Sequence, residues 1–166
     1  MKLRRVLPVV LSLLCALSVA GCAPKAAERR LKDGYYTAEA AIFEEHGWKE
    51  FVTICVRDGQ IINVEYNAKN RTGFLKSWDM VYMREMNAVS HTYPNQYTRL
   101  YAQGLLEAQS PDGVDLITGA TESYETFMQL ADAVMYRAQT GDTSVSFVLI
   151  DEPWKQAGDA EGGASQ

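Results

Sequence analysis

The sequence predicts an α+β fold, in which an antiparallel β-meander of three to four strands packs against about three α-helices. Three segments between residues 34 and 68 alternate apolar and polar residues, which is typical of half-buried strands. Asp58-Gly59 joins the second segment to the third and is a strong signal for a tight hairpin. Three later segments repeat apolar residues at helical spacing. The apolar face of such a sheet must be buried against other elements, and the helices are predicted to pack on it.

The strands are predicted over residues 34–42, 50–57 and 60–68. The side chains expected on the core face are Tyr36, Ala38, Ala40 and Ile42, then Val52, Ile54 and Val56, then Ile62, Val64, Tyr66 and Ala68. Cys55 falls on the opposite face, where we expect a small packing residue rather than a semi-exposed thiol. Residues 145–150 form a candidate fourth strand, although nothing local identifies its partner.

Helices are predicted over residues 77–89, 95–109 and 121–139. Ser77 is a candidate N-cap for the first helix, because a serine hydroxyl can accept a bond from the first-turn amides. The apolar side chains of that helix are Trp78, Val81, Tyr82, Met86 and Val89. Gly141 is a natural end for the last helix, since glycine readily adopts the left-handed conformation of a helix C-terminus.

The N-terminus has the pattern of a secretory signal, with three cations before a short apolar run over residues 6–20. That run is shorter than the roughly 20 residues needed to span a bilayer. It ends in Val19-Ala20-Gly21-Cys22, and a cysteine directly after Ala-Gly resembles the lipobox of bacterial lipoproteins. The resemblance implies cleavage before Cys22, a lipid on Cys22, and a position on the extracytoplasmic face of the bacterial cell membrane. The alternative is a plain signal peptide with a coincidental cysteine.

The chain is therefore predicted to consist of a lipoprotein signal peptide (1–21), a lipidated tether (22–33), one domain (34–150) and a disordered tail (151–166). Loss of the signal would remove three cations and lower the formal net charge from −5 to −8. Such a charge argues against nucleic-acid binding. Cys55 would be the last free thiol, so no intramolecular disulfide is expected. The two histidines, His46 and His91, lack the spacing of a metal pair, and no metal is predicted.

The segment Asp115-Leu116-Ile117-Thr118-Gly119-Ala120-Thr121 lies where a loop becomes a helix. The first turn of a helix leaves about four N–H groups unpaired and carries roughly half a positive charge, so a phosphate can be held there. Gly119 allows backbone conformations closed to other residues, and Thr121 offers a hydroxyl that can become a phosphoester. The alternative is that Thr118 is simply the N-cap of an ordinary helix.

Asp-x-x-Thr-Gly-Ala-Thr resembles the flavinylation motif of the FMN-binding domain family, and residues 34–141 are similar to its small lipoprotein branch. The family includes flavin-bearing subunits of the Rnf and Na⁺-pumping NADH:quinone oxidoreductase complexes. There, a flavin transferase esterifies the FMN half of FAD onto the last Thr or Ser of the motif. The resemblance implies a covalent FMN on Thr121, with Asp115, Thr118, Gly119 and Ala120 as the recognition frame.

Trp78, Met83 and Tyr97 are the candidate neighbours of a flavin ring, because they lie on or beside the helices most able to approach the motif. Arg71 or Lys76 is a candidate cation near the reducing end of the flavin. Lysine and arginine are mostly exposed in proteins, which favours the alternative of a solvated basic loop.

The leading functional hypothesis is an extracytoplasmic, membrane-anchored electron carrier, matured by a flavin transferase, with an unidentified redox donor and acceptor. The sequence offers no nucleophile–base pair, and we therefore do not predict an enzyme in its own right. One alternative is a non-redox, surface-binding lipoprotein in which the motif is vestigial or holds a phosphate ligand without a covalent bond. Another is a flavoenzyme that reduces a small extracellular acceptor.

Overall fold

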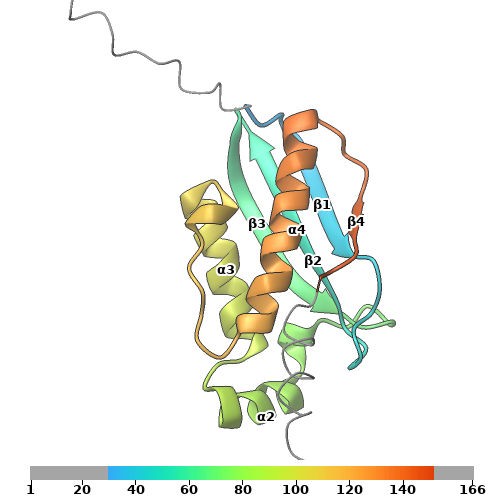
Figure 1. Cartoon of the computed structure of the whole chain (residues 1–166), viewed down its shortest axis with the longest axis vertical. Coiled ribbons are helices and arrows are strands. Elements are labelled where there is room, and N and C mark those ends of the chain that lie inside the picture. Colours follow the sequence, from blue (N-terminus) through green and yellow to red (C-terminus); the bar gives the residue numbers. More distant parts are fainter. Residues whose placement is uncertain (1–29, 152–166) are drawn as a thin grey trace, which may run out of the picture.

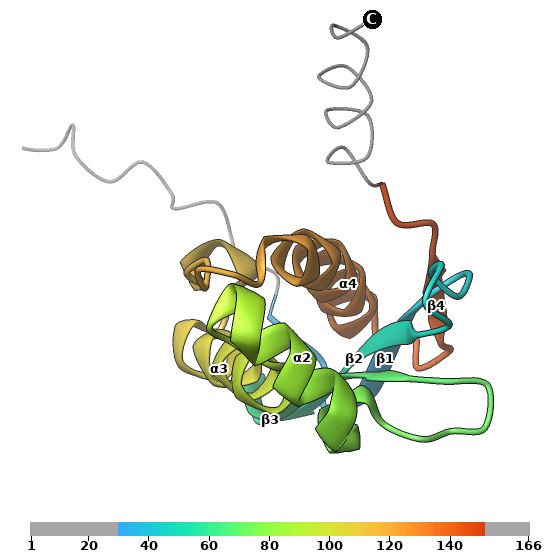
Figure 2. The same cartoon turned by 90° about the horizontal axis from the view of Figure 1, so that it is seen from below.

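The computed structural model describes residues 30–151, which form a four-stranded sheet with the order β3-β2-β1-β4. Strands β1 (Gly34–Ala40), β2 (Lys49–Arg57) and β3 (Gln60–Lys69) make the antiparallel meander. Strand β4 (Ser146–Val148) pairs with β1 in parallel. Helices cover one face of the sheet, as Figure 1 and Figure 2 show. The predicted α+β class is confirmed, and the partner of the fourth strand, which no local signal identified, is β1.

The β2–β3 hairpin turns at Asp58 and Gly59, whose φ angles are 55° and 76°. Two positive φ angles are the signature of the tight turn that the Asp-Gly pair predicts. The register shifts at Cys55/Val56, so that Val56 pairs with Ile61 while Cys55 pairs with Asn63. The bulge changes which side chain faces the core: Ile61 is 3% exposed and Ile62 is 44% exposed. The assignment of Ile62 to the core was therefore wrong, whereas Cys55 is buried as predicted.

Three α-helices follow the meander: α2 (Met80–Ser90), α3 (Pro94–Ala108) and α4 (Thr121–Thr140). Two short 3₁₀ turns, η2 (Lys76–Trp78) and η3 (Pro111–Gly113), precede α2 and follow α3. The assignment of Ser77 as an N-cap was wrong. Asp79 caps α2, with its carboxylate accepting from two first-turn amides. Ser77 is instead buried, and its hydroxyl accepts a bond from Asn67 on β3.

The core lies between the sheet and two helices, with α3 packed over β3 and α4 over β1 and β2. Aromatic rings fill its centre. Tyr101 is stacked on Phe127 with 5.3 Å between ring centroids, and Tyr66 lies 4.9 Å from Phe127. Helix α2 differs from the other two because none of its residues is buried. It lies beyond one end of the sheet, next to the start of α4 (Figure 1).

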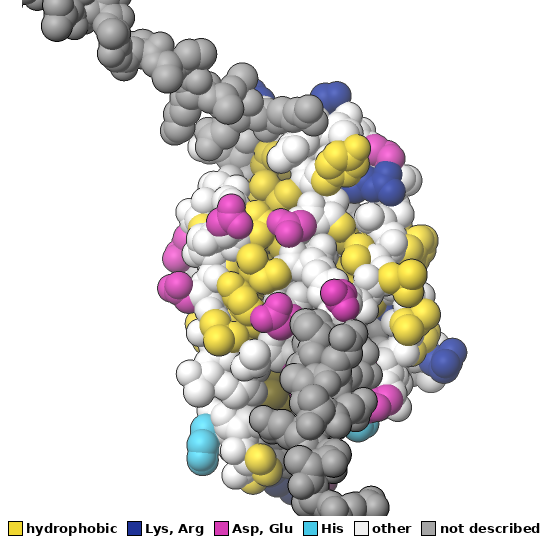
Figure 3. Space-filling view, in the orientation of Figure 1, with side chains coloured by type: hydrophobic (Ala, Val, Ile, Leu, Met, Phe, Trp, Pro, Cys, Tyr) yellow, Lys and Arg dark blue, Asp and Glu magenta, His cyan; other side chains and the backbone are white. Residues whose placement is uncertain are grey.

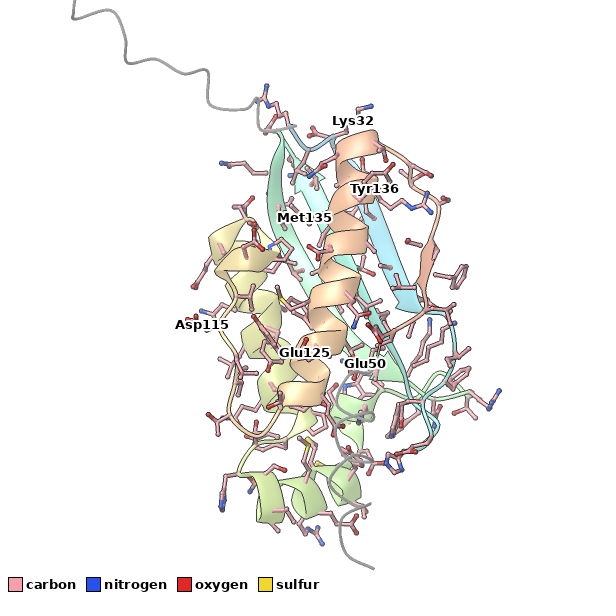
Figure 4. The ribbon with its side chains drawn as sticks, viewed as in Figure 1. Lys32, Glu50, Asp115, Glu125, Met135 and Tyr136 are labelled. Atoms are coloured by element: carbon pink, nitrogen blue, oxygen red, sulfur yellow. The ribbon has the colours of Figure 1, made fainter. Side chains whose placement is uncertain are left out.

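The chain enters the domain at the end of α4 that is far from the motif. The Lys32 amide donates to Ala138 O at 2.9 Å, and its ammonium donates to Thr140 O at 2.9 Å. A helix of 20 residues is about 30 Å long. Lys32 and the start of α4 are therefore at opposite ends of the domain, as Figure 4 shows for Lys32 and Glu50.

Within the described part of the chain, no helix combines the length and apolarity that crossing a bilayer requires. The predicted signal peptide, Cys22, residues 22–29 of the tether and residues 152–166 of the tail lie outside the described residues.

Candidate functional site

The motif occupies the connection between η3 and α4, and Thr121 is the first residue of that helix. The N-cap residue is Ala120, with φ −129° and ψ 34°, and its methyl group cannot accept a hydrogen bond. The alternative that Thr118 caps the helix was therefore wrong. No described residue accepts a hydrogen bond from the amides of Thr121, Glu122 or Ser123, so the first turn of α4 presents free donors.

Gly119 is the point where the motif touches α2. Its φ angle is +83°, a left-handed conformation that side chains with a Cβ rarely adopt. A Cβ at this position would overlap the carbonyl oxygen of Ser90, the last residue of α2. Gly119 thus adopts one of the backbone conformations that glycine allows and that are closed to other residues. The close neighbour within the protein is the Ser90 backbone, which the sequence did not predict.

Two tyrosine hydroxyls hold the motif loop in place. The Tyr101 hydroxyl accepts a bond from the Ile117 amide at 3.2 Å and donates to Ala120 O at 3.1 Å. Burial raises the pKa of Tyr101 to about 12, so that the hydroxyl keeps its proton and remains a donor at neutral pH. The Tyr124 hydroxyl donates to Val114 O at 3.0 Å. Helical spacing alone predicts that both tyrosines are ordinary core side chains. The spacing indicates which face of the helix they lie on, but it does not indicate which group their hydroxyls bond.

A cavity of about 670 Å³ opens beside the start of α4. Its walls come from the end of β1 and the loop after it, from η2 and α2, from Tyr97 on α3, and from the Gly119–Ser123 segment. Small-molecule sites usually measure about 300–1,000 Å³. The complete lining is Ala40, Ile42, Phe43, Glu44, Glu45, His46, Trp48, Glu50, Lys76, Tyr82, Met86, Ser90, Tyr97, Gly119, Ala120, Thr121, Glu122, Ser123, Thr126 and Ile150.

Half of the predicted site residues meet at this cavity. Gly119, Ala120, Thr121 and Tyr97 line it, whereas the exposed side chains of Asp115 and Thr118 lie outside its lining. Trp78 and Met83 also lie outside the lining. Trp78 belongs to a 3₁₀ turn instead of the predicted α-helix, is 61% exposed, and packs edge-on against Phe74. Among the ring-neighbour candidates, Tyr97 is the one that reaches the cavity.

A polar cluster of Glu50, Tyr66, Lys76 and Tyr97 lies beneath the motif. Glu50 faces inward from β2, and its Oε2 accepts a 2.6 Å bond from the Tyr66 hydroxyl. That hydroxyl also lies 2.9 Å from the carbonyl oxygen of Ser123 in the first turn of α4. Figure 4 shows Glu50 close to the start of α4. The cluster therefore joins the sheet to the helix that carries the motif.

Lys76 is 8% exposed, and its ammonium nitrogen lies 4.7 Å from the centre of the Tyr82 ring. Burial alone would lower the pKa of Lys76. Attraction to Tyr97, Glu50 and Tyr82 outweighs that effect and holds the pKa above its ordinary value. Lys76 therefore stays charged inside the domain. The expectation of a solvated basic loop was wrong for Lys76, but Arg71 is exposed, with its guanidinium 4.6 Å from the ring centre of Phe43.

Burial raises the pKa of Glu50 to about 7, against the opposing effects of Lys76 and the Tyr66 hydroxyl. Glu44 and Glu122, which also line the cavity, add to the upward shift by repulsion. Burial likewise raises the pKa of Tyr97 to about 12, so this hydroxyl is protonated at neutral pH. The site thus contains one permanent cation and one carboxyl group that titrates near neutrality.

The lining of the cavity is rich in carboxylates: Glu44, Glu45, Glu50 and Glu122. The Glu44 carboxylate accepts bonds from the amides of His46 and Trp48, which orders the loop between β1 and β2. Acidic side chains are also spread over the face of the molecule that carries α4 (Figure 3). An anionic ligand would therefore need the buried cation and the free amides of α4 to offset this charge.

Comparisons with known proteins identify relatives that span most of the domain. The chain is 36% identical over 112 residues to the 15 kDa lipoprotein of Treponema pallidum (strain Nichols), covering 68% of this chain and 79% of the relative. The crystal structure of the CPE2226 protein from Clostridium perfringens superimposes with a TM-score of 0.70 at 39% identity, over 73% of this chain and 99% of that one. No family model matches the sequence.

Proposed function

Because this chain belongs to the family of the Treponema pallidum 15 kDa lipoprotein, we propose that it is a membrane-anchored lipoprotein that carries FMN covalently on Thr121. Its role would be electron transfer on the extracytoplasmic face of the membrane. The relative supports the lipid anchor, for which Cys22 is the candidate residue. The flavin rests on the motif and on the cavity beside it.

One observation carries the flavin proposal: Thr121 begins an α-helix whose first-turn amides are free, and it lines a cavity of about 670 Å³. The residues present fit FMN. The amides of residues 121–123 would hold the phosphate, Gly119 and Ala120 would shelter it, and Tyr82 and Tyr97 would offer aromatic surface to the ring. FMN would supply the redox chemistry, while the protein supplies position and electrostatics.

Attachment requires a flavin transferase and FAD. The Thr121 hydroxyl gives up its proton, its oxygen bonds to the FMN phosphorus, the pyrophosphate bond of FAD breaks, and AMP leaves. Thr121 is exposed, so the enzyme has access to the hydroxyl without unfolding the domain. Covalent attachment suits the exterior of a cell, where a dissociated FMN would be lost to the medium.

Thr121 variants co-expressed with a flavin transferase test the proposal. Wild type should keep flavin fluorescence in a denaturing gel and gain the mass of one FMN. Thr121→Ala has no hydroxyl and should lose both signals, yet fold, because an exposed substitution usually changes stability by less than about 0.5 kcal/mol. Thr121→Ser should regain part of the signal. Fluorescence that persists in Thr121→Ala would move the attachment to another residue, with Thr118 or Ser123 the next candidates.

The acidic lining favours a second candidate function, in which a non-redox lipoprotein binds a small polar or cationic molecule in the same cavity. Glu44, Glu45 and Glu122 would attract such a ligand and repel a phosphate. Absence of a fluorescent band in wild type, with active transferase and FAD present, would reject the covalent carrier and favour this binding function. If flavin is loaded, turnover with soluble acceptors separates a flavoenzyme from an electron carrier.

A further inference from the structure

Lys76 is an unusual residue to find in the wall of this cavity. Its side chain is 8% exposed, although burial of a lysine is costly unless the charge is compensated. Among the residues that the structure describes, it takes part in none of the close ion pairs. Its ammonium group lies over the face of the Tyr82 ring, 4.7 Å from the ring centre. The ammonium group therefore retains donors for a ligand in the cavity.

The start of α4 provides donors in the same region. Tyr97 on α3 and Ser123 in the first turn of α4 line the same cavity as Lys76, so the cation and the start of the helix face one space. The amides of residues 121–123 have no acceptor among the described residues. A buried cation and a set of free amides that share one cavity are a combination suited to an oxyanion.

Glu50 controls how much positive charge this region carries. Its carboxylate cancels the charge of Lys76 when it is ionised and leaves that charge uncompensated when it is protonated. Several elements bring titratable and charged groups to Glu50 or to the cavity that it lines. They are Glu44, Glu45 and His46 from the loop after β1, Tyr66 from β3, Lys76 from η2, Tyr82 from α2, Tyr97 and Tyr101 from α3, and Glu122 from α4. The tyrosines keep their protons at neutral pH, whereas the pKa of Glu50 is about 7.

We propose that Lys76 and the first turn of α4 form an oxyanion-binding site, which opens when Glu50 is protonated and weakens when Glu50 ionises. Oxyanion binding is thus coupled to uptake of a proton by the Glu50 carboxylate. The identity of the oxyanion rests on the proposed function. In the flavinylated protein, the oxyanion is the phosphodiester on Thr121. The binding site itself is a property of the unmodified protein.

Sulfate is the probe, because it stays doubly charged between pH 6 and pH 8 and its own titration cannot mimic that of Glu50. The mature chain with Cys22→Ser is titrated by calorimetry, with sodium chloride replaced by sodium sulfate at constant ionic strength. A carboxyl group with a pKa of about 7 is about nine-tenths protonated at pH 6 and about one-tenth at pH 8. Wild type should therefore bind sulfate up to about tenfold more tightly at pH 6. Lack of binding at pH 6 would overturn the proposal.

Variants separate the role of Lys76 in binding the oxyanion from the role of Glu50 in controlling its pH dependence. Lys76→Met should abolish binding and Lys76→Arg should retain it. Glu50→Gln should bind equally at both pH values, with about the affinity of wild type at pH 6. Lys69→Met is the control, because Lys69 pairs with Glu39 away from the cavity. Should Lys76→Met not fold, the double variant Lys76→Met/Glu50→Gln removes both charges together and should also lose binding. Unchanged sulfate affinity in either Lys76→Met variant would overturn the assignment of Lys76.

The flavin proposal and this one can fail separately. Thr121→Ala cannot carry FMN but keeps the backbone amide of residue 121, so it should still bind sulfate, more tightly at pH 6 than at pH 8. Flavinylated wild type should no longer bind sulfate, because the phosphodiester occupies the site. Full sulfate binding by the flavinylated protein would overturn the identification of the oxyanion with the phosphodiester. Sulfate binding in a protein that never becomes flavinylated would reject the flavin proposal alone.

Discussion

Gly119 illustrates how a single residue can combine two constraints. Its φ of +83° and its contact with Ser90 O both exclude a side chain. Gly73 has a similar φ, +85°, but a Cβ added there would meet no atom within 4 Å, which makes this glycine a matched control. We expect Gly73→Ala to cost only the backbone strain, about 1 kcal/mol. Gly119→Ala adds the overlap with Ser90 and should cost at least about 1 kcal/mol more.

Urea unfolding of both glycine variants measures these costs, and flavin loading provides a second readout. Gly119→Val, with a β-branched side chain, should lose flavin attachment while far-UV circular dichroism shows that the sheet survives. Equal destabilisation of Gly73→Ala and Gly119→Ala, with full loading of both, would mean that the contact with Ser90 has no role in shaping the motif.

Glu50 should make stability depend on pH. Its pKa rises from about 4.5 in the unfolded chain to about 7 in the folded one, so the folded state binds more protons between these values. The contribution of Glu50 to stability therefore falls as pH rises from 4.5 to 7 and is constant above. Glu50→Gln cannot ionise. The free energy of unfolding of Glu50→Gln, relative to that of wild type, should therefore rise by up to about 3 kcal/mol between pH 4.5 and pH 7. Urea unfolding at pH 5, 6, 7 and 8 checks this, and a constant difference would contradict the raised pKa.

At the scale of elements, Tyr101 attaches the motif loop to α3 through hydrogen bonds. Its hydroxyl is bonded to both Ile117 and Ala120. Tyr101→Phe would leave the partly buried Ile117 amide without a partner, whereas Ala120 O would keep its bond from the Tyr124 amide. An unsatisfied buried group costs about 1–3 kcal/mol. We expect lower stability and reduced flavin loading in this variant. Tyr124→Phe is the control, because it removes a single bond, to Val114, outside the motif. Equal flavin loading of the two variants would show that the hydrogen bond between Tyr101 and Ala120 O does not position Thr121.

Helix α2 is the least supported element of the fold. None of its residues is buried, yet Tyr82, Met86 and Ser90 line the cavity. Tyr82 packs edge-on against Trp48, Met86 packs against the core, and Ser90 contacts Gly119. The wall of the cavity that α2 forms is therefore held by partly exposed contacts and not by buried residues of its own.

At the scale of the whole molecule, the first described residues and the cavity lie at opposite ends of the domain. The chain enters beside the C-terminal end of α4, about 30 Å from Thr121. A lipid at Cys22 would therefore hold the far end of the domain toward the membrane and leave the cavity accessible to soluble partners.

Cys22→Ser removes the residue that is proposed to carry the lipid, and stable anchoring needs more than one acyl chain. This variant should therefore move from the membrane fraction to the medium or keep its signal uncleaved. Membrane fractionation measures this, and unchanged processing and retention would contradict lipid anchoring.

The residue pattern alone was enough to predict those features that arise from neighbours along the chain. Alternation identified the three meander strands, Asp58-Gly59 identified their hairpin, and helical spacing identified α3 and α4 to within a residue or two. Local chemistry was also enough to recognise Gly119 and Thr121 as a loop entering a helix. These signals are local because side-chain period and turn conformation depend on only a few consecutive residues.

What meets at the cavity depends instead on packing between distant segments. The pairing of β4 with β1, the bulge that buries Ile61, and the contact between Gly119 and Ser90 each join such segments. The polar cluster does the same, since Glu50, Tyr66, Lys76 and Tyr97 come from four different elements. No local pattern distinguishes Lys76 from an exposed lysine, because its charge state and its burial depend on packing partners that folding brings together.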